Sequence, residues 1–180
     1  PYEDRVVPAL IHDDCPMPCF MGIRPGITSI DAAVYRLTTH AWSSSSEADF
    51  PAQVRYAVMY NAVLPRTLMN WRWSEAPPDW IDRTELGGVL VEDRDVLNLT
   101  IRTNLSVGEF FLAFGAPDAS SFLESYNHEY RYTAWYARLG LFISAQGPCP
   151  VWHSPHFPVH VSFPVETRRF FSEDSADRVC

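Results

Sequence analysis

Residues able to bind a metal ion gather in two short segments, one near each end of the 180-residue chain. They are three histidines and three cysteines: His12, Cys15, Cys19, Cys149, His153 and His156. Imidazole and thiolate groups are the ligands that zinc prefers, and two such segments together could close a tetrahedral site. Prolines interrupt both segments and favour an extended backbone, and the remaining cysteine, Cys180, would have no part in that site. We therefore keep the metal site as an alternative and expect no cofactor.

All four cysteines are better explained as disulfide partners than as a redox centre. Cys15 and Cys19 are separated by three residues, not the two of a redox motif, and no helix is expected to begin before Thr28. Four cysteines allow three pairings. We favour Cys19 with Cys149 and Cys15 with Cys180, because each bond would close a long loop and stabilise the fold by roughly 4 kcal/mol. Since cytoplasmic proteins rarely depend on disulfides, we expect an extracytoplasmic protein.

Other catalytic patterns are absent from the sequence. The chain has no nucleophile elbow of the G-x-S-x-G type and no glycine-rich phosphate loop. Ser154 lies between His153 and His156, but neighbours in sequence do not form a triad, and the segment is typical of a polar loop. The acidic run 92–95 falls on a predicted hairpin tip, where nothing would raise a carboxyl pKa for acid catalysis. We expect a protein that is not an enzyme, with an extracytoplasmic metal-dependent hydrolase using the two histidines as the alternative.

Composition narrows the classes of partner. The chain is 47% apolar and 14% aromatic, enough for one substantial core. Its net charge is -8 and all 14 basic residues are arginine, without the basic stripe that nucleic-acid binding requires. No run of about 18 apolar residues predicts a membrane span. The chain begins at Pro1, so we expect a processed protein that is secreted, or attached to the envelope through a removed N-terminal segment.

The first part of the chain predicts an arm, a helix and strands. Residues 1–26 are rich in proline, which resists helix and central strand, so we expect an extended N-terminal arm. Thr28 is the predicted N-cap of a helix over 29–40, where apolar residues recur at helical spacing. Period-two alternation then predicts a strand over 69–73 and favours one over 54–63, where Ala57, Met59 and Ala62 leave a helix open as the alternative.

A hairpin is predicted next. Two β-rich runs, 86–91 and 96–103, flank the charged residues 92–95, which are typical of a turn exposed to solvent. Alternation along the second run places Leu97 and Leu99 on one face and polar residues on the other. The sequence therefore predicts an antiparallel sheet with one face in water.

The rest of the chain predicts a second helix and more strands. Ser106 and Glu109 form an S-x-x-E capping box before an apolar run, and Gly115 and Pro117 follow as stop signals. Further strands are expected over 121–127, 129–138, 140–145 and 159–165.

An aromatic strand supplies the candidate binding residues. In the predicted strand 129–138, tyrosines alternate with Arg131 and Trp135, and we expect the tyrosine face to lie in the core. Tyr, Trp and Arg are enriched at the energetic centres of protein interfaces. Arg131 and Trp135, together with Asn70 and Arg72 if the sheet is continuous, are therefore predicted to bind a protein partner.

The two helix starts also predict an internal repeat. Thr28 aligns with Ser106 at an offset of 78 residues, and strands follow both helices. We therefore expect one compact α+β unit made of two related halves, 27–104 and 105–180, each a helix with antiparallel strands and with both helices on one face of the sheet.

These helix starts resemble a known family. The segments Gly26–Leu37 and Leu105–Asp118 resemble the signature of SmpA/OmlA (BamE-like) modules, and their tandem layout resembles the β-lactamase inhibitor protein. The cysteine-rich opening and the Trp-Arg-Trp strand also resemble a group of uncharacterised exported bacterial proteins. The resemblance implies helix-on-sheet modules that bind other proteins outside the cytoplasm, often in envelope assembly. The expected function is a non-enzymatic binding or assembly subunit, with a structural subunit of a membrane complex or surface filament as the alternative.

Overall fold

The structure, a computed structural model, describes residues 10, 15–45, 53–59, 62–124, 130–147 and 159–165, with the backbone alone at 53–59, 62–66 and 124. Ten regular helices and strands, with one short 3-10 turn, make up the described fold. In chain order they are α2 Ile30–Thr39, β1 Gln53–Met59, β2 Ala62–Trp71, β3 Gly87–Glu92, β4 Asp95–Thr103, α3 Val107–Phe114, β5 Ala119–Glu124, β6 Tyr130–Tyr136, η2 Ala137–Leu139, β7 Leu141–Gly147 and β8 Val159–Pro164.

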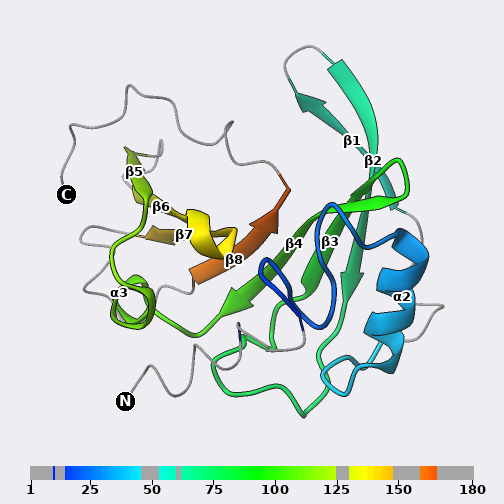
Figure 1. Ribbon diagram of the computed structural model, residues 1–180, viewed down its shortest axis with the longest axis horizontal. Helices are drawn as coiled ribbons and strands as arrows, with labels where there is room; N and C mark the ends of the chain where they lie inside the picture. The colour runs from blue at the N-terminus through cyan, green and yellow to red at the C-terminus, as the bar shows by residue number, and fades with distance from the viewer. Residues whose placement is uncertain are drawn as a thin grey trace.

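The strands form one continuous antiparallel sheet. Its order is β1-β2-β3-β4-β8-β7-β6-β5, so each half contributes four neighbouring strands and β4 pairs with β8 at the junction. Along the chain, a helix precedes each set of four strands (Figure 1). α2 lies beside the strands of the first half and α3 beside those of the second. The predicted α+β class and antiparallel sheet are confirmed.

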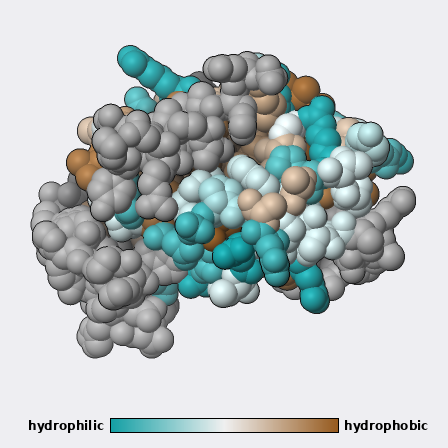
Figure 2. All heavy atoms as spheres, turned by 90° about the horizontal axis from the view of Figure 1, so that it is seen from below, coloured by the Kyte–Doolittle hydropathy of each residue, from teal (hydrophilic) through white to brown (hydrophobic). Residues whose placement is uncertain are grey.

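The core lies against one face of this sheet. Alternate residues of the central strands are fully buried, including Leu99 and Ile101 on β4 and Val161 and Phe163 on β8. Both helices add residues to the same hydrophobic cluster, among them Leu37. On the side of the molecule seen in Figure 2, hydrophilic and intermediate residues occupy most of the described surface, with smaller hydrophobic areas between them.

The β3–β4 hairpin turns at its charged tip, as predicted. Asp93 and Arg94 both have positive φ, 48° and 73°, which is the left-handed conformation of a tight two-residue hairpin turn. The register shifts between Leu90 and Val91, so the simple alternation breaks near the turn. Because of this bulge Val96 is buried, whereas Leu97, predicted to share the buried face of Leu99, is only partly covered.

The start of α2 is one residue later than predicted. Its N-cap is Ser29, whose Oγ accepts a hydrogen bond from the Ala32 amide at 3.4 Å. Thr28 is held in extended backbone instead, because its carbonyl accepts from the Val96 amide at 3.0 Å. Its hydroxyl accepts from the Arg24 amide at 2.9 Å. The two caps, Ser29 and Ser106, are therefore 77 residues apart, not 78.

The start of α3 matches its prediction. Ser106 Oγ accepts from the Glu109 amide at 3.3 Å, and the Glu109 carboxylate accepts from the Ser106 amide at 2.6 Å. This reciprocal pair is the capping box that the sequence indicates. Gly115 ends the helix at φ +78°, a conformation that glycine adopts without steric cost.

The cysteine pairing differs from the one we favoured. Cys15 is bonded to Cys19, with a Cα–Cα distance of 5.9 Å. This bond excludes the predicted pairs of Cys19 with Cys149 and Cys15 with Cys180. Cys149 and Cys180 themselves lie outside the described residues. The spacing of four residues is short, but a turn can bring the two Cα atoms within the distance that a disulfide spans.

The described part of the predicted arm, residues 15–26, is turned rather than extended. Phe20 and Ile23 form an antiparallel bridge closed by two backbone hydrogen bonds of 2.8 and 3.1 Å. Both side chains are buried, at 3% and 0% exposure, and Phe20 stacks on Phe163 of β8 at 5.9 Å. The prolines indicated a backbone without helix, but the apolar residues between them draw the segment into the core.

Candidate functional site

The sheet face opposite the core carries the predicted binding residues. Cross-strand register joins one residue from each of six neighbouring strands into a single row. From β2 to β6 this row is Asn70, Gly88, Thr100, Ser162, Phe142 and Trp135. Five steps of about 4.8 Å make the row about 24 Å long. The sheet is continuous, so the condition for including Asn70 is met.

The four predicted residues share this face but form two separate pairs. Arg131 and Trp135 lie four residues apart on β6, on the side opposite the buried Tyr132. Asn70 lies on β2, and Arg72 follows one residue after that strand ends. Four strands lie between the two pairs. The sheet therefore places them at opposite ends of one surface, not in one cluster.

The tyrosine face of β6 is buried, as predicted. Tyr132 and Tyr136 are 1% and 4% exposed. Burial raises the pKa of Tyr132 to about 12, because the charged phenolate would lose its hydration. Burial also raises the pKa of Tyr136, with a smaller contribution from Tyr132. Both phenols are therefore neutral at ordinary pH and serve the core.

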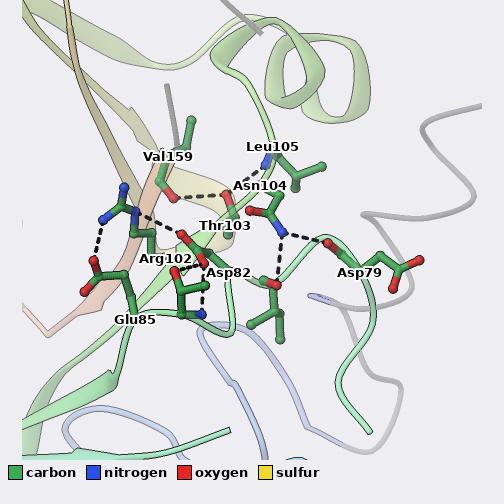
Figure 3. A network of polar contacts seen from close by, with 10 residues as sticks. Asp79, Asp82, Glu85, Arg102, Thr103, Asn104, Leu105 and Val159 are labelled. Atoms are coloured by element: carbon green, nitrogen blue, oxygen red, sulfur yellow. Dashed lines mark hydrogen bonds and ion pairs between the residues drawn. The ribbon is translucent and has the colours of Figure 1, made fainter. Parts of the chain in front are cut away.

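A charged cluster lies beside the end of β4 on this face, and the sequence reasoning did not find it. Arg102 of β4 pairs through Nε with Asp82 at 3.2 Å and through Nη1 with Glu85 at 2.8 Å (Figure 3). Asp82 also accepts hydrogen bonds from the backbone and hydroxyl of Thr84, at 3.0 and 2.6 Å. The acidic residues lie in the loop before β3, and only the tertiary structure brings that loop beside β4.

The loop that carries these carboxylates is tied to the end of β4. Asn104 Nδ2 donates to the carbonyl oxygens of Asp79 and Ile81, at 2.9 and 3.2 Å (Figure 3). The Thr103 hydroxyl donates to the Val159 carbonyl at 3.0 Å. The two Asn104 bonds satisfy backbone carbonyls of the loop and fix its position beside the sheet, whereas the Thr103 bond joins β4 to β8.

His160 is the titratable residue of this surface. His160 on β8 lies opposite Arg102 on β4 in the strand register, and it is exposed to solvent. Its pKa is lowered by partial burial first and by the positive charge of Arg102 second, while Glu85 and Asp82 act in the opposite direction. His160 is thus neutral at neutral pH, able to accept or donate one hydrogen bond to a ligand.

Hydroxyl groups line the face between the two pairs of candidates. Thr100 and Ser162 are 3.3 Å apart across β4 and β8. At the β6 end of the face, Ser121 and Thr133 are 2.7 Å apart across β5 and β6, and both are buried. The face therefore combines a neutral hydrogen-bonding centre with an aromatic and cationic end on β6. This chemistry suits recognition of another surface through hydrogen bonds and aromatic contacts.

The alternative metal site loses two of its six proposed ligands. Cys15 and Cys19 are joined in the disulfide and offer no thiolate. His12, Cys149, His153 and His156 lie outside the described residues. Within the described ranges, no three side chains of His, Cys, Asp or Glu are grouped as a metal site requires.

The chain matches no protein-family model, no curated protein and no solved structure. Neither of the two helices described is long and apolar enough to cross a membrane.

Proposed function

We propose that this protein is a non-enzymatic, extracytoplasmic binding or assembly subunit of the bacterial cell envelope. Its partner is another protein, and its binding surface is the sheet face that carries Asn70, Arg72, Arg131 and Trp135. The observation that carries the proposal is the continuous row from Asn70 to Trp135, a partly exposed surface about 24 Å long. That length is comparable to the span of a protein interface of standard size.

The chemistry of the face supports a protein partner. Arg131 is exposed and Trp135 partly exposed, and both are residue types enriched where interfaces gain most of their energy. The hydroxyl-bearing centre supplies hydrogen-bond donors and acceptors without charge. An interface of this kind joins an aromatic anchor to a polar surround.

The layout of the chain supports the binding role through the family resemblance. Helix and four strands occur twice along the chain, and we infer that the two halves are tandem modules of the BamE-like kind, with both helices on one face of the sheet. Such modules leave the other sheet face open for a partner. The bonded Cys15–Cys19 pair agrees with an oxidising compartment, because disulfides persist outside the cytoplasm.

Site-specific photo-crosslinking in the native envelope tests this proposal. A benzophenone amino acid placed at Arg131, Trp135 or Asn70 should yield the same discrete protein adduct. Placed at Tyr35, which is 69% exposed on α2, it should yield none. Adducts that appear equally from Tyr35, or no adduct from any of the three face positions, would contradict the proposal.

A further inference from the structure

The Cys15–Cys19 loop contacts both halves of the molecule. Pro18, inside the loop, lies so close to Gly140 that a Cβ added to this glycine would be 2.9 Å from the Pro18 ring. Gly140 belongs to the turn between β6 and β7, and its φ is +58°. Phe20, directly after the loop, stacks on Phe163 of β8 and meets Trp73 edge-on at 6.3 Å. The disulfide loop therefore joins a first-half aromatic cluster to a second-half turn.

The turn that Pro18 contacts is also the end of the hairpin that carries the aromatic part of the proposed binding surface. Tyr136 pairs with Leu141 beside the turn, and Trp135 pairs with Phe142 one step further along the strands. The backbone between Gly140 and Trp135 is short and includes the η2 turn. Gly140 is therefore joined to the Trp135–Phe142 pair through the closed end of this hairpin.

The two sulfurs of the bond differ in access. Cys19 is buried at 5% exposure, whereas Cys15 is only partly covered. An external thiolate therefore reaches the Cys15 sulfur first, and Cys19 is the leaving group. Because the bond closes a short loop, it restricts the unfolded chain less than a long-range bond does. Its main effect is on the geometry of the folded 15–19 loop.

We propose that the Cys15–Cys19 disulfide is a redox-operated clasp that holds the β6–β7 turn and thereby positions Trp135 in the partner-binding face. The thiolate of a dithiol reductant attacks Cys15 Sγ, the protein S–S bond breaks, and Cys19 takes a proton as a thiol. The second reductant thiol then attacks the mixed disulfide, leaving Cys15 reduced and the reductant oxidised. The opened loop releases Pro18 from Gly140. The regulatory meaning rests on the proposed function of the sheet face.

Fluorine NMR of the full chain labelled with 5-fluorotryptophan tests the clasp. The Trp135 signal is assigned as the one lost in Trp135→Phe. Reduction with dithiothreitol, at unchanged far-UV circular dichroism, should displace this signal by more than its linewidth. A Cys15→Ala/Cys19→Ala variant should show the displaced signal from the start and should not respond to dithiothreitol.

A pair of glycine variants tests the same contact without touching the cysteines. Gly140→Ala places a methyl group against Pro18 and should displace the Trp135 signal in the oxidised protein. Gly115→Ala is the control for a positive φ without a facing side chain, since its φ is +78° and nothing lies within 4 Å of an added Cβ. It should leave the signal in place. Because Tyr136 donates to the Gly115 carbonyl, the double variant Gly140→Ala/Pro18→Gly is the second control and should restore the signal. These variants keep the proposal open to refutation if the double-alanine variant does not fold.

Two results would overturn the clasp. One is a Trp135 signal that is the same in the oxidised, reduced and Gly140→Ala proteins. The other is a dithiothreitol response that persists in the double-alanine variant, which would assign it to Cys149 or Cys180. Neither readout needs a partner, so a failed clasp and a failed binding function are distinguished: the first appears in the NMR spectrum and the second in the crosslinking.

Discussion

The two helices occupy corresponding places in the chain but are attached to the fold by different chemistry. The two buried residues of α2 are aliphatic, Ala33 and Leu37, and Tyr35 on the same helix is 69% exposed. α3 buries Val107 and Phe110 and contacts β6 through further aromatic rings.

α2 packs through aliphatic side chains and adds one exposed ion pair, whereas aromatic contacts dominate the packing of α3. Asp31 of α2 pairs with Arg94 at the β3–β4 hairpin tip, 2.6 Å away. Phe111 and Phe114 of α3 lie 6.2 and 5.9 Å from Tyr132 and Tyr136. A common order of elements thus places no strict demand on side-chain chemistry, since each helix needs only one buried stripe. The aromatic anchorage of α3 also fixes the strand whose other face carries Trp135.

Truncating the largest fully buried side chain of each helix gives the largest expected loss of stability. Phe110→Ala should lower the free energy of unfolding by about 3–5 kcal/mol, and Leu37→Ala by about 2–5 kcal/mol, because each leaves a cavity. Urea unfolding with a constant slope measures both. Leu112→Ala, at a side chain 64% exposed, is the control and should cost far less. A loss at Leu112 equal to that at Phe110 would contradict the described orientation of α3.

The buried Tyr132 in the second half should make the protein lose stability at alkaline pH. Tyr132 has a pKa of about 12 when folded and 10.0 when unfolded, a difference worth roughly 2–3 kcal/mol. The unfolded chain loses its proton first, so stability is intact below pH 10 and falls as the pH rises toward 12.

Thermal unfolding between pH 8 and 12 measures this loss. Tyr132→Phe should unfold like the native chain at pH 8 and lose less stability above pH 10. Identical dependence of thermal stability on pH in the two proteins would contradict this prediction. At the acid end, the lowered pKa of His160 predicts a separate loss of stability as the pH falls below about 6.5, which His160→Gln should reduce.

The N-cap with the more complete hydrogen bonding, Ser106, should stabilise the protein more than the N-cap Ser29. Ser106→Ala removes one partner of a reciprocal box and should cost about 1–2 kcal/mol. Ser29→Ala removes a single bond of 3.4 Å and should cost about 0.5 kcal/mol. Chemical unfolding compares them. Equal losses at the two caps would remove this difference between the helices.

The smallest effect is expected at the polar anchor of α2. Asp31 and Arg94 are 77% and 75% exposed, so their ion pair is screened by water and salt. Asp31→Asn should change the free energy of unfolding by less than about 0.5 kcal/mol, and 0.5 M NaCl should reduce the effect further. A loss larger than that of Ser106→Ala would show that the ion pair stabilises α2 far more than an exposed pair does.

Much of the fold could be read from local patterns. Both helices, the charged hairpin and the strands on either side of Gly140 lie where periodicity, caps and turn residues predict them. The errors lie where a distant segment intervenes. Thr28 resembles a cap, but pairing with Val96 draws it into extended backbone. The bulge at Leu90 and Val91 depends on how two strands meet, which neither strand records alone.

The candidate site was predicted less completely than the fold. Alternation along β6 placed Arg131 and Trp135 on the open face, because side chains of a strand point alternately to its two sides. The pairing of Arg102 with Asp82 and Glu85 had no local signal, since these residues meet only when the loop before β3 returns to β4. Asn70 could be added only once the sheet was known to be continuous.

The sequence by itself determined the kind of most elements, their approximate places along the chain and the apolar face of strands such as β6. These features depend on neighbours a few residues away, whose types and spacing are written in the chain. Tertiary structure alone decided that β4 pairs with β8 and that Cys15 bonds to Cys19. It also decided that the Cys15–Cys19 loop lies against the turn at Gly140. The strand pairing and the loop contact join residues that are far apart in the chain, and the disulfide is one of several possible cysteine pairings. Both kinds of contact therefore depend on how the whole fold packs.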